Sequence, residues 1–236
     1  MSIKEKAFTL SETLIALTII GVVAAITIPS LMVQHQKEQT VVQLKKAYSD
    51  FARAARMAQT IYGDISSWDY TLTNNAFFKQ YFYPYISLSK QTVAEAARDN
   101  IKYYQTSGQV ENGLLIMRDQ GEIIEMISGC QIFTYPLVYG GTGSTIPLKC
   151  YAIDINGYKK PNKFGRDLFM ICIDADKGIT PHYWNDNEDA NIKRTREQLL
   201  KGPSSYRYNC SKSARGMWCA AVILRDGWQI KNDYPW

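Results

Sequence analysis

The stretch Phe8-Thr-Leu-Ser-Glu-Thr-Leu-Ile-Ala-Leu-Thr-Ile-Ile-Gly-Val-Val-Ala-Ala-Ile-Thr-Ile-Pro-Ser-Leu-Met-Val33 decides how the rest of the chain is organised. Its only charged residue is Glu12. At about 1.5 Å of rise per residue, a helix of this length crosses the roughly 30 Å of hydrocarbon in a bilayer. Residues 1–7 form a short polar leader in front of it. The sequence therefore predicts that residues 8–33 span a membrane.

Two residues distinguish this stretch from an ordinary membrane anchor. Glu12 lies about one helical turn inside the apolar segment, where a carboxylate without a partner costs about 2.5–3.5 kcal/mol or more. Pro29 lies near the far end, where it removes a helical N–H group and crowds the carbonyl of Ala25. We expect the carboxylate to need a partner and the proline to bend the helix.

With the leader, these residues resemble the class III signal of type IV pilins and type II secretion pseudopilins. The resemblance runs from Lys4 to about Met32 and includes the pair Ala7–Phe8, with Glu12 fifth after the cut. It implies that a prepilin peptidase cuts between Ala7 and Phe8, methylates the new amine and leaves the apolar helix on the mature subunit. One departure is Ala7, since the family usually has glycine before the cut.

The resemblance also implies an assembly role for Glu12, Gly21 and Pro29. Cutting after Ala7 creates a positive amine on Phe8, which can pair with Glu12 of a neighbouring subunit in an apolar filament core and offset the desolvation of both charges. The alternative is that Glu12 lies at the headgroup boundary and reaches towards water. The implied partners are other pilin or pseudopilin subunits, the prepilin peptidase, an inner-membrane assembly platform and the membrane itself.

Two other interpretations of the apolar stretch remain open. A plain signal anchor fits the hydropathy but gives no reason for Ala7–Phe8 or for Glu12. A cleaved secretory signal has an apolar region of about 7–15 residues, shorter than the one here, although Val23-Ala24-Ala25 resembles a cleavage site. The predicted function is a structural subunit of a type IV pilus-like or type II secretion filament. The alternative is a minor or tip subunit that binds substrate, a surface or DNA.

The cysteines indicate on which side of the membrane the head lies. All five lie beyond the apolar stretch, as expected if that part folds in an oxidising space. We therefore expect a single-pass protein of the inner membrane, with its amino terminus in the cytoplasm and its head outside. After assembly it would be part of a periplasmic or cell-surface filament.

The rest of the chain predicts an α+β fold. From residue 34 to 62, apolar residues recur at alternating steps of three and four, which predicts an amphipathic continuation of the helix, ended by Gly63 and Asp64. We expect its apolar side to pack on an antiparallel sheet of about four strands rather than in a coiled coil. The predicted organisation is a leader at 1–7, a membrane helix at 8–33, an amphipathic helix at 34–62 and a globular head at 63–236.

Short helices and then strands are expected within the head. Helices are predicted at 75–83 and from the capping box at Thr92 to about Tyr104. The first contains four aromatic residues, which we expect to form a packed core and not a surface for ligand stacking. The strands are expected at 114–118, 122–127, 132–138, 149–155 and 168–173, with turns at 119–121 and at Asn156-Gly157.

The loop between the last two predicted strands holds candidate ligands for a calcium ion. Asp154, Asn156, Asn162 and Asp167 offer the oxygen atoms that calcium prefers, but an EF-hand needs a glutamate twelfth from Asp154 and this chain has Gly165 there. The resemblance adds that major pseudopilins use an acidic loop of the sheet region for calcium. Tight turns favour the same residue types for backbone reasons alone.

The cysteine pairing cannot be deduced from spacing alone. The resemblance to the carboxy-terminal loop of many type IV pilins implies a disulfide between Cys210 and Cys219. Cys130 and Cys150 form a second candidate pair, which leaves Cys172 as the expected free thiol, buried in its strand.

Catalysis and nucleic-acid binding find little support in the sequence. Neither histidine has an evident catalytic partner, and His182 is expected in an exposed loop, so we predict that the protein is not an enzyme. No cofactor other than calcium is expected. The net charge of +5 is mild and interspersed, which argues against a nucleic-acid partner without excluding one.

Overall fold

A computed structural model describes residues 9–89, 101–112, 123–134, 147–183, 194–202 and 207–236. The predicted cleavage pair, most of the helix that opens at Thr92 and the strand at 114–118 with its turn lie outside these residues. The predicted end of that helix is wrong, because residues 101–104 are not helical and Tyr104 forms β-bridges with Val110 and Lys163. The chain divides into two compact units, Met1–Gln39 and Thr40–Trp236.

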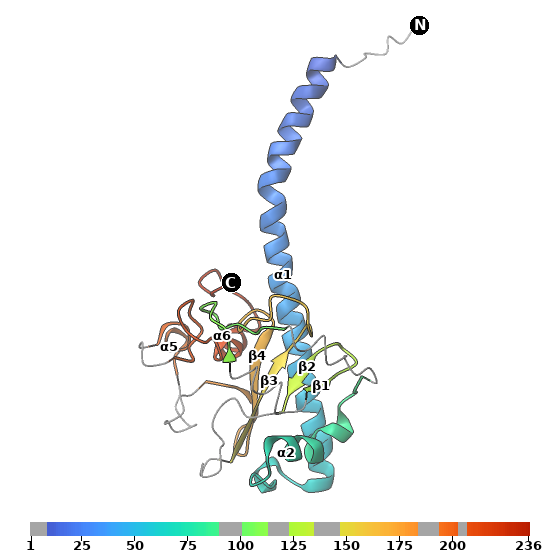
Figure 1. The fold of residues 1–236 in the computed structure, drawn as a ribbon, viewed down its shortest axis with the longest axis vertical. Coiled ribbons are helices and arrows are strands. Elements are labelled where there is room, and N and C mark those ends of the chain that lie inside the picture. Colours follow the sequence, from blue (N-terminus) through green and yellow to red (C-terminus); the bar gives the residue numbers. More distant parts are fainter. Residues whose placement is uncertain (1–8, 90–100, 113–122, 135–146, 184–193, 203–206) are drawn as a thin grey trace. The chain divides into compact units, whose positions relative to one another are not determined.

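The long helix α1 spans Leu10–Tyr62 and continues through Pro29 (Figure 1). This confirms the predicted helix. It ends where Gly63 adopts a φ of +75°, and the N–H of that glycine donates to the carbonyl of Gln59 at 3.0 Å. A left-handed glycine at this position is the usual way to end a helix, because glycine has no Cβ to strain the turn.

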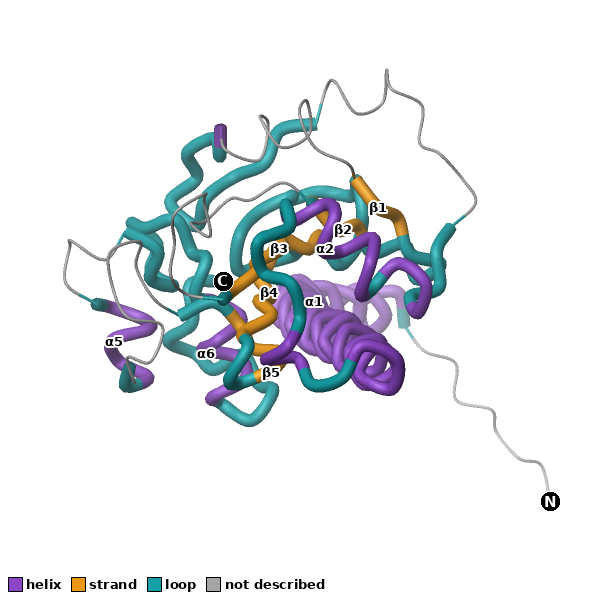
Figure 2. The backbone as a smooth tube through the Cα atoms, turned by 90° about the horizontal axis from the view of Figure 1, so that it is seen from below, coloured by secondary structure: helices purple, strands orange, loops and turns teal. Residues whose placement is uncertain are grey.

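The second unit contains a five-stranded antiparallel sheet in the order β1-β2-β3-β4-β5 (Figure 2). The strands are β1 (Ile123–Glu125), β2 (Gln131–Phe133), β3 (Leu148–Asp154), β4 (Leu168–Asp174) and β5 (Gly178–Pro181). The α+β class is thereby confirmed. Strands β3 and β4 pair over seven residues, from Leu148 opposite Asp174 to Asp154 opposite Leu168, and both are buried throughout.

Within the second unit, the part of α1 after Thr40 packs on this sheet. Its buried residues are Thr40, Leu44, Ala47, Phe51, Ala54, Ala55 and Ala58. The Phe51 ring lies 6.4 Å from that of Tyr151 in β3. Small alanines let the helix backbone approach the strands closely, which explains why the periodic pattern ends in alanines instead of in a coiled-coil seam.

Helix α2 (Asn74–Tyr81) places the aromatic cluster in the core, as predicted. Thr73 caps its first turn by accepting a hydrogen bond from the N–H of Ala76. Phe77, Phe78, Tyr81 and Phe82 are all buried, and short 3₁₀ turns at Ile65–Ser67 and Tyr83–Tyr85 flank the helix. The cluster is therefore a packed core, with no stacking face left open for a ligand.

Two carboxy-terminal helices complete the unit. Helix α6 (Cys219–Arg225) packs against β4 and β5, and α5 (Arg196–Lys201) packs against α6. Helices α5 and α6 and strand β5 are not among the predicted elements. Helix α5 does carry a sequence signal, since Thr195 and Gln198 form a capping box.

The disulfides correct one predicted pair. The structure contains the Cys210–Cys219 bridge implied by the resemblance, but the second bridge joins Cys150 to Cys172 instead of to Cys130. Cys150 and Cys172 lie directly opposite each other on β3 and β4, so strand register brings their Cα atoms to 4.0 Å. Cys130 is the free, buried cysteine, and the expectation of a free Cys172 is wrong.

Candidate functional site: the amino-terminal helix and the β3–β4 loop

Glu12 takes part in a capping box at the start of α1. The N–H and the hydroxyl of Thr9 donate to Glu12 Oε2 at 2.9 and 2.8 Å, and the Glu12 N–H donates back to the Thr9 hydroxyl oxygen at 3.2 Å. The Thr9-Leu-Ser-Glu12 spacing is the Thr-x-x-Glu signature of a capping box. The interpretation of Glu12 as an intersubunit partner does not take this signature into account. The carboxylate therefore has a local role that any test of assembly must separate from charge pairing.

Between Thr13 and Val33, helix α1 presents an uncharged apolar surface. From Leu10 to Val33 its large side chains are between 40% and 78% exposed. Within the described residues, α1 is the one helix long and apolar enough, by length and composition, to cross a membrane. An exposed apolar surface of this extent is stable only when lipid or other protein covers it.

Gly21 and Pro29, the other predicted assembly residues, are exposed on α1. A Cβ added at Gly21 meets no described atom within 4 Å. Pro29 leaves one carbonyl of α1 without its helical N–H partner. Both residues therefore weaken the helix without contributing to the packing of this single chain.

The β3–β4 loop brings the four predicted calcium ligands together. Asp167 accepts hydrogen bonds from the N–H groups of Asn162 at 2.7 Å and Lys163 at 2.5 Å. Asp154 Oδ1 accepts the N–H of Asn156 at 3.1 Å. Asp154 Oδ2 and Asn162 Oδ1 are buried and have no hydrogen-bond partner among the described residues. A buried oxygen without a donor is costly, so these two atoms require a proton, a water molecule or a cation.

The Asn156 side chain lies between the two carboxylates. In one orientation its amide nitrogen donates to Asp167 Oδ2 at 3.3 Å. In the reversed orientation the nitrogen donates to Asp154 Oδ1 at 2.8 Å and to the carbonyls of Lys159 and Gly157 at 3.1 and 3.2 Å. The amide oxygen then takes the position 3.3 Å from Asp167. The Asn156 amide oxygen therefore faces the carboxylate of Asp154 in the first orientation and that of Asp167 in the second.

Burial makes the ionised form of both acids unfavourable. Desolvation raises the pKa of Asp154 well above its usual range, and the nearby Asp167 raises it further. Desolvation also raises the pKa of Asp167, opposed by its hydrogen bonds to backbone N–H groups. Gln131, which lies directly opposite Asp154 in the β2–β3 pair, adds another buried side-chain oxygen without a partner among the described residues. The four predicted ligands did not include it.

His182 is fully buried, which corrects the expected exposed loop. Burial, followed by the charges of Arg215 and Arg194, lowers its pKa to about 3. Its ring packs edge-on against Tyr208 at 5.7 Å. The imidazole is therefore neutral in the folded protein at physiological pH, as a core histidine is.

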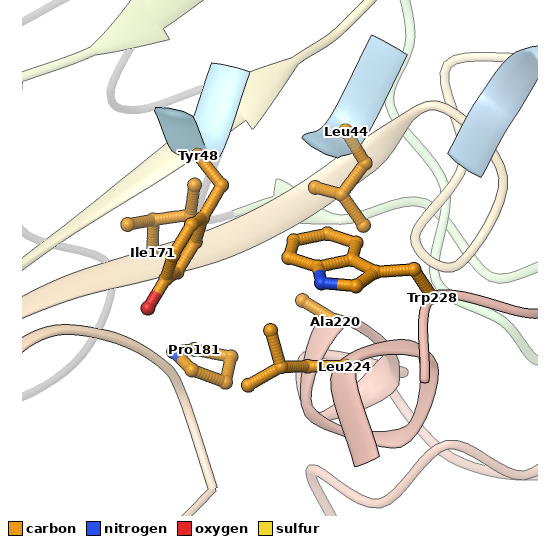
Figure 3. Close-up of a pocket in the computed structure, with 7 residues that line it drawn as sticks. All are labelled: Leu44, Tyr48, Ile171, Pro181, Ala220, Leu224 and Trp228. Atoms are coloured by element: carbon orange, nitrogen blue, oxygen red, sulfur yellow. The ribbon is translucent and has the colours of Figure 1, made fainter. Parts of the chain in front are cut away.

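A shallow apolar pocket separates α1 from the carboxy-terminal helix (Figure 3). Its wall is formed by Leu44, Tyr48, Ile171, Pro181, Ala220, Leu224 and Trp228. The Tyr48 and Trp228 rings meet at 5.5 Å, and the Tyr48 hydroxyl donates to the Ile179 carbonyl at 2.5 Å. The described residues that line the pocket are apolar apart from the Trp228 indole and the Tyr48 hydroxyl, which already donates to Ile179, so the pocket is a packing junction for the carboxy-terminal tail.

The fold and the amino-terminal site define a class: an α+β protein carried on one exposed apolar helix. Residues 3–28 match the family model of the prokaryotic N-terminal methylation motif, which is the type IV pilin and pseudopilin signal. Residues 30–127 match the model of a family of unknown function, DUF6613. No curated protein and no solved structure matches the chain. The methylation signal supports a pilin-type subunit, in a family whose members are structural and assemble with other pilin subunits after prepilin-peptidase processing.

Proposed function

We propose that the chain is a subunit of a type IV pilus-like or type II secretion filament, cut after Ala7 and assembled through residues 8–33. The observation that carries the proposal is the helix surface from Thr13 to Val33, which is uncharged, has exposed large apolar side chains and lies largely within the matched methylation motif at residues 3–28. Lipid covers such a surface before assembly, and neighbouring helices cover it in a filament. The leader at 1–7 would stay in the cytoplasm, and the head at 63–236 would lie outside the inner membrane.

Filament formation tests this proposal. The chain is produced with and without an inner-membrane assembly platform, and the sheared surface or periplasmic fraction is examined for filaments that contain it. We expect filaments only when the platform is present. A protein that stays a lone membrane monomer with the platform and peptidase present contradicts the proposal.

A minor or tip role is the alternative within the same class, with the head binding substrate, a surface or DNA. Copy number and position distinguish the two roles. Immunogold labelling along the whole filament supports the structural subunit. Labelling confined to one end, at a few copies per filament, supports the tip subunit.

We further propose that Asp154, Asn156, Asn162 and Asp167 hold a calcium ion. What supports it is the pair of buried oxygens without donors, on Asp154 and Asn162, beside a second buried carboxylate. When bound, the ion supplies the positive charge that lets both carboxylates remain ionised. The loop residues orient these oxygens through the hydrogen bonds of Asn156 and Asp167.

Thermal unfolding tests the calcium site. Because the pKa values of Asp154 and Asp167 are raised, their contribution to stability without calcium is lost as pH rises through those values. Calcium should therefore stabilise the protein more at pH 7 than at pH 5. At a free calcium concentration about one hundred times Kd, the stabilisation is about 2.7 kcal/mol. Asp154→Asn should abolish the response, and Asp176→Asn, at an exposed position outside the loop, should retain it. Equal Tm values in calcium and in EDTA contradict the site.

A further inference from the structure

The β3–β4 loop also presents a cluster of positive charges on its outer surface. Lys159 and Lys160 are exposed, and Lys163 and Arg166 are half-buried. The only acids in the loop, Asp154 and Asp167, point their charge inward and are buried. Its solvent-facing charge is therefore entirely positive.

A second segment adds to this cluster. Lys212, in the Cys210–Cys219 disulfide loop, is exposed and close enough to act on Lys163. The pKa of Lys163 is lowered by burial first and then by the charges of Arg166 and Lys212. None of the five cations forms a salt bridge with a described residue. We call Lys159, Lys160, Lys163, Arg166 and Lys212 the basic cluster.

The loop that carries the cluster is held rigidly. The carbonyl of Gly165 accepts the hydroxyl of Tyr234 at 2.7 Å, and Phe164 donates its N–H to the Tyr104 carbonyl at 2.9 Å. The Arg166 guanidinium stacks 4.4 Å above the ring of the terminal Trp236. Arg166 is thus presented beside an aromatic ring, a combination found at membrane interfaces.

The chain itself limits how far this cluster can lie from the bilayer. Thr40 donates its hydroxyl to the Arg166 carbonyl at 3.1 Å, which ties the loop to the first residue of the second unit. Thr40 follows Val33, the end of the apolar run, by only seven residues. Those residues span about 10 Å as a helix and at most about 25 Å fully extended. The chain therefore keeps the Thr40–Arg166 contact within about 10–25 Å of Val33.

We propose that the basic cluster docks the head on anionic phospholipid headgroups while residues 8–33 are in the bilayer. Lys and Arg residues close to an anionic bilayer surface are attracted to it by about 1 kcal/mol each, and the attraction falls off within a Debye length of about 8 Å. The tether favours lipid over DNA, because insertion of residues 8–33 keeps the cluster close to the bilayer. This inference rests on membrane insertion, which is part of the proposed function.

The test uses the full chain in vesicles, with a spin label at Ser213→Cys beside Lys212 in a Cys130→Ala background. Vesicles of phosphatidylcholine alone are compared with vesicles holding about 30% phosphatidylglycerol, each with a trace of nickel-chelating lipid that relaxes nearby labels. Flotation after a carbonate wash reports insertion separately. If the chain does not float, residues 8–33 do not insert, and both the membrane anchor and the docking are refuted. If it floats, the label relaxation tests the docking alone.

We expect the label to relax faster with anionic lipid than with phosphatidylcholine alone, and we expect about 0.5 M salt to remove this difference. With anionic lipid, Lys159→Glu/Lys160→Glu should lower the ratio of docked to undocked heads at least about tenfold. The control Arg53→Glu/Arg56→Glu makes the same change in charge. These arginines lie about 20–24 Å beyond Thr40 along α1, so the control should dock normally. Equal relaxation in both vesicle types, or an equal loss in the control, overturns the proposal. Salt-sensitive binding of a DNA duplex on neutral vesicles, with no effect of anionic lipid on the label, overturns it in favour of nucleic acid.

Discussion

The two units of this chain differ in where they place their apolar side chains. In the first unit, Leu10 to Val33 are exposed, and the described contacts are hydrogen bonds within α1 itself. In the second unit, one continuous core joins the later part of α1, the sheet and the carboxy-terminal helices. A region that buries its own apolar surface is stabilised by the chain, whereas one that does not is stabilised by its surroundings. Changes in the first unit should therefore affect assembly, and changes in the second should affect folding.

The largest expected effect separates the two roles of Glu12. Glu12→Gln keeps the capping box, because glutamine also accepts from the capping residue, but removes the charge. Thr9→Val keeps the charge but removes the cap hydroxyl. If the charge pairs with a neighbouring amine, Glu12→Gln abolishes filaments and Thr9→Val leaves them, and both variants still insert into the membrane.

Counting filaments by electron microscopy, with membrane insertion scored by flotation, measures this difference. Normal filaments from Glu12→Gln rule out the pairing, and loss of filaments from Thr9→Val alone shows that capping is what matters.

A second comparison tests the tight packing of the second unit. Gly216 has a φ of +86°, and a Cβ there would lie 1.6 Å from the Thr106 hydroxyl oxygen. Gly108 has a φ of +88° and no described atom within 4 Å of that position. Gly216→Ala should cost several kcal/mol, roughly 3 or more, and Gly108→Ala about 1 kcal/mol. Urea unfolding in detergent gives both values, and equal costs would mean that the contact at Thr106 relaxes freely.

The smallest expected effect is a pH dependence from His182. Its pKa is about 3 when folded and about 6.5 when unfolded, so its contribution to stability is present above pH 6.5 and is lost as pH falls towards 3. The slope is at most about 1.4 kcal/mol per pH unit. His182→Phe should flatten the fall in unfolding free energy between pH 7 and pH 5, and His35→Phe, in the exposed first unit, should not. An unchanged slope in His182→Phe would assign the pH dependence to other groups.

The sequence predicts features that depend on local chemistry better than features that depend on tertiary contacts. Helix α1, its end at Gly63 and strands β3 and β4 follow from periodicity and glycine conformation, and the structure confirms them. The Cys150–Cys172 pairing and the burial of His182 depend on which strands meet, and spacing carries no information on that. The short β5 strand has only four residues, too few for a periodic pattern.

The same contrast holds for the sites. The Thr9–Glu12 capping box has a sequence signature and could have been predicted. The orphaned oxygen of Gln131 opposite Asp154, and the approach of Lys212 to Lys163, arise from the sheet register and from the folding of the disulfide loop. Such neighbours become visible only in the folded chain.

The most direct test of the central claim is the intact mass of the protein recovered from membranes of cells that contain a prepilin peptidase. We predict a chain that begins at Phe8, carries one methyl group on its amine and retains residues 8–33. A mature protein that begins beyond Val33, or one that keeps residues 1–7 although the peptidase is active, contradicts the account.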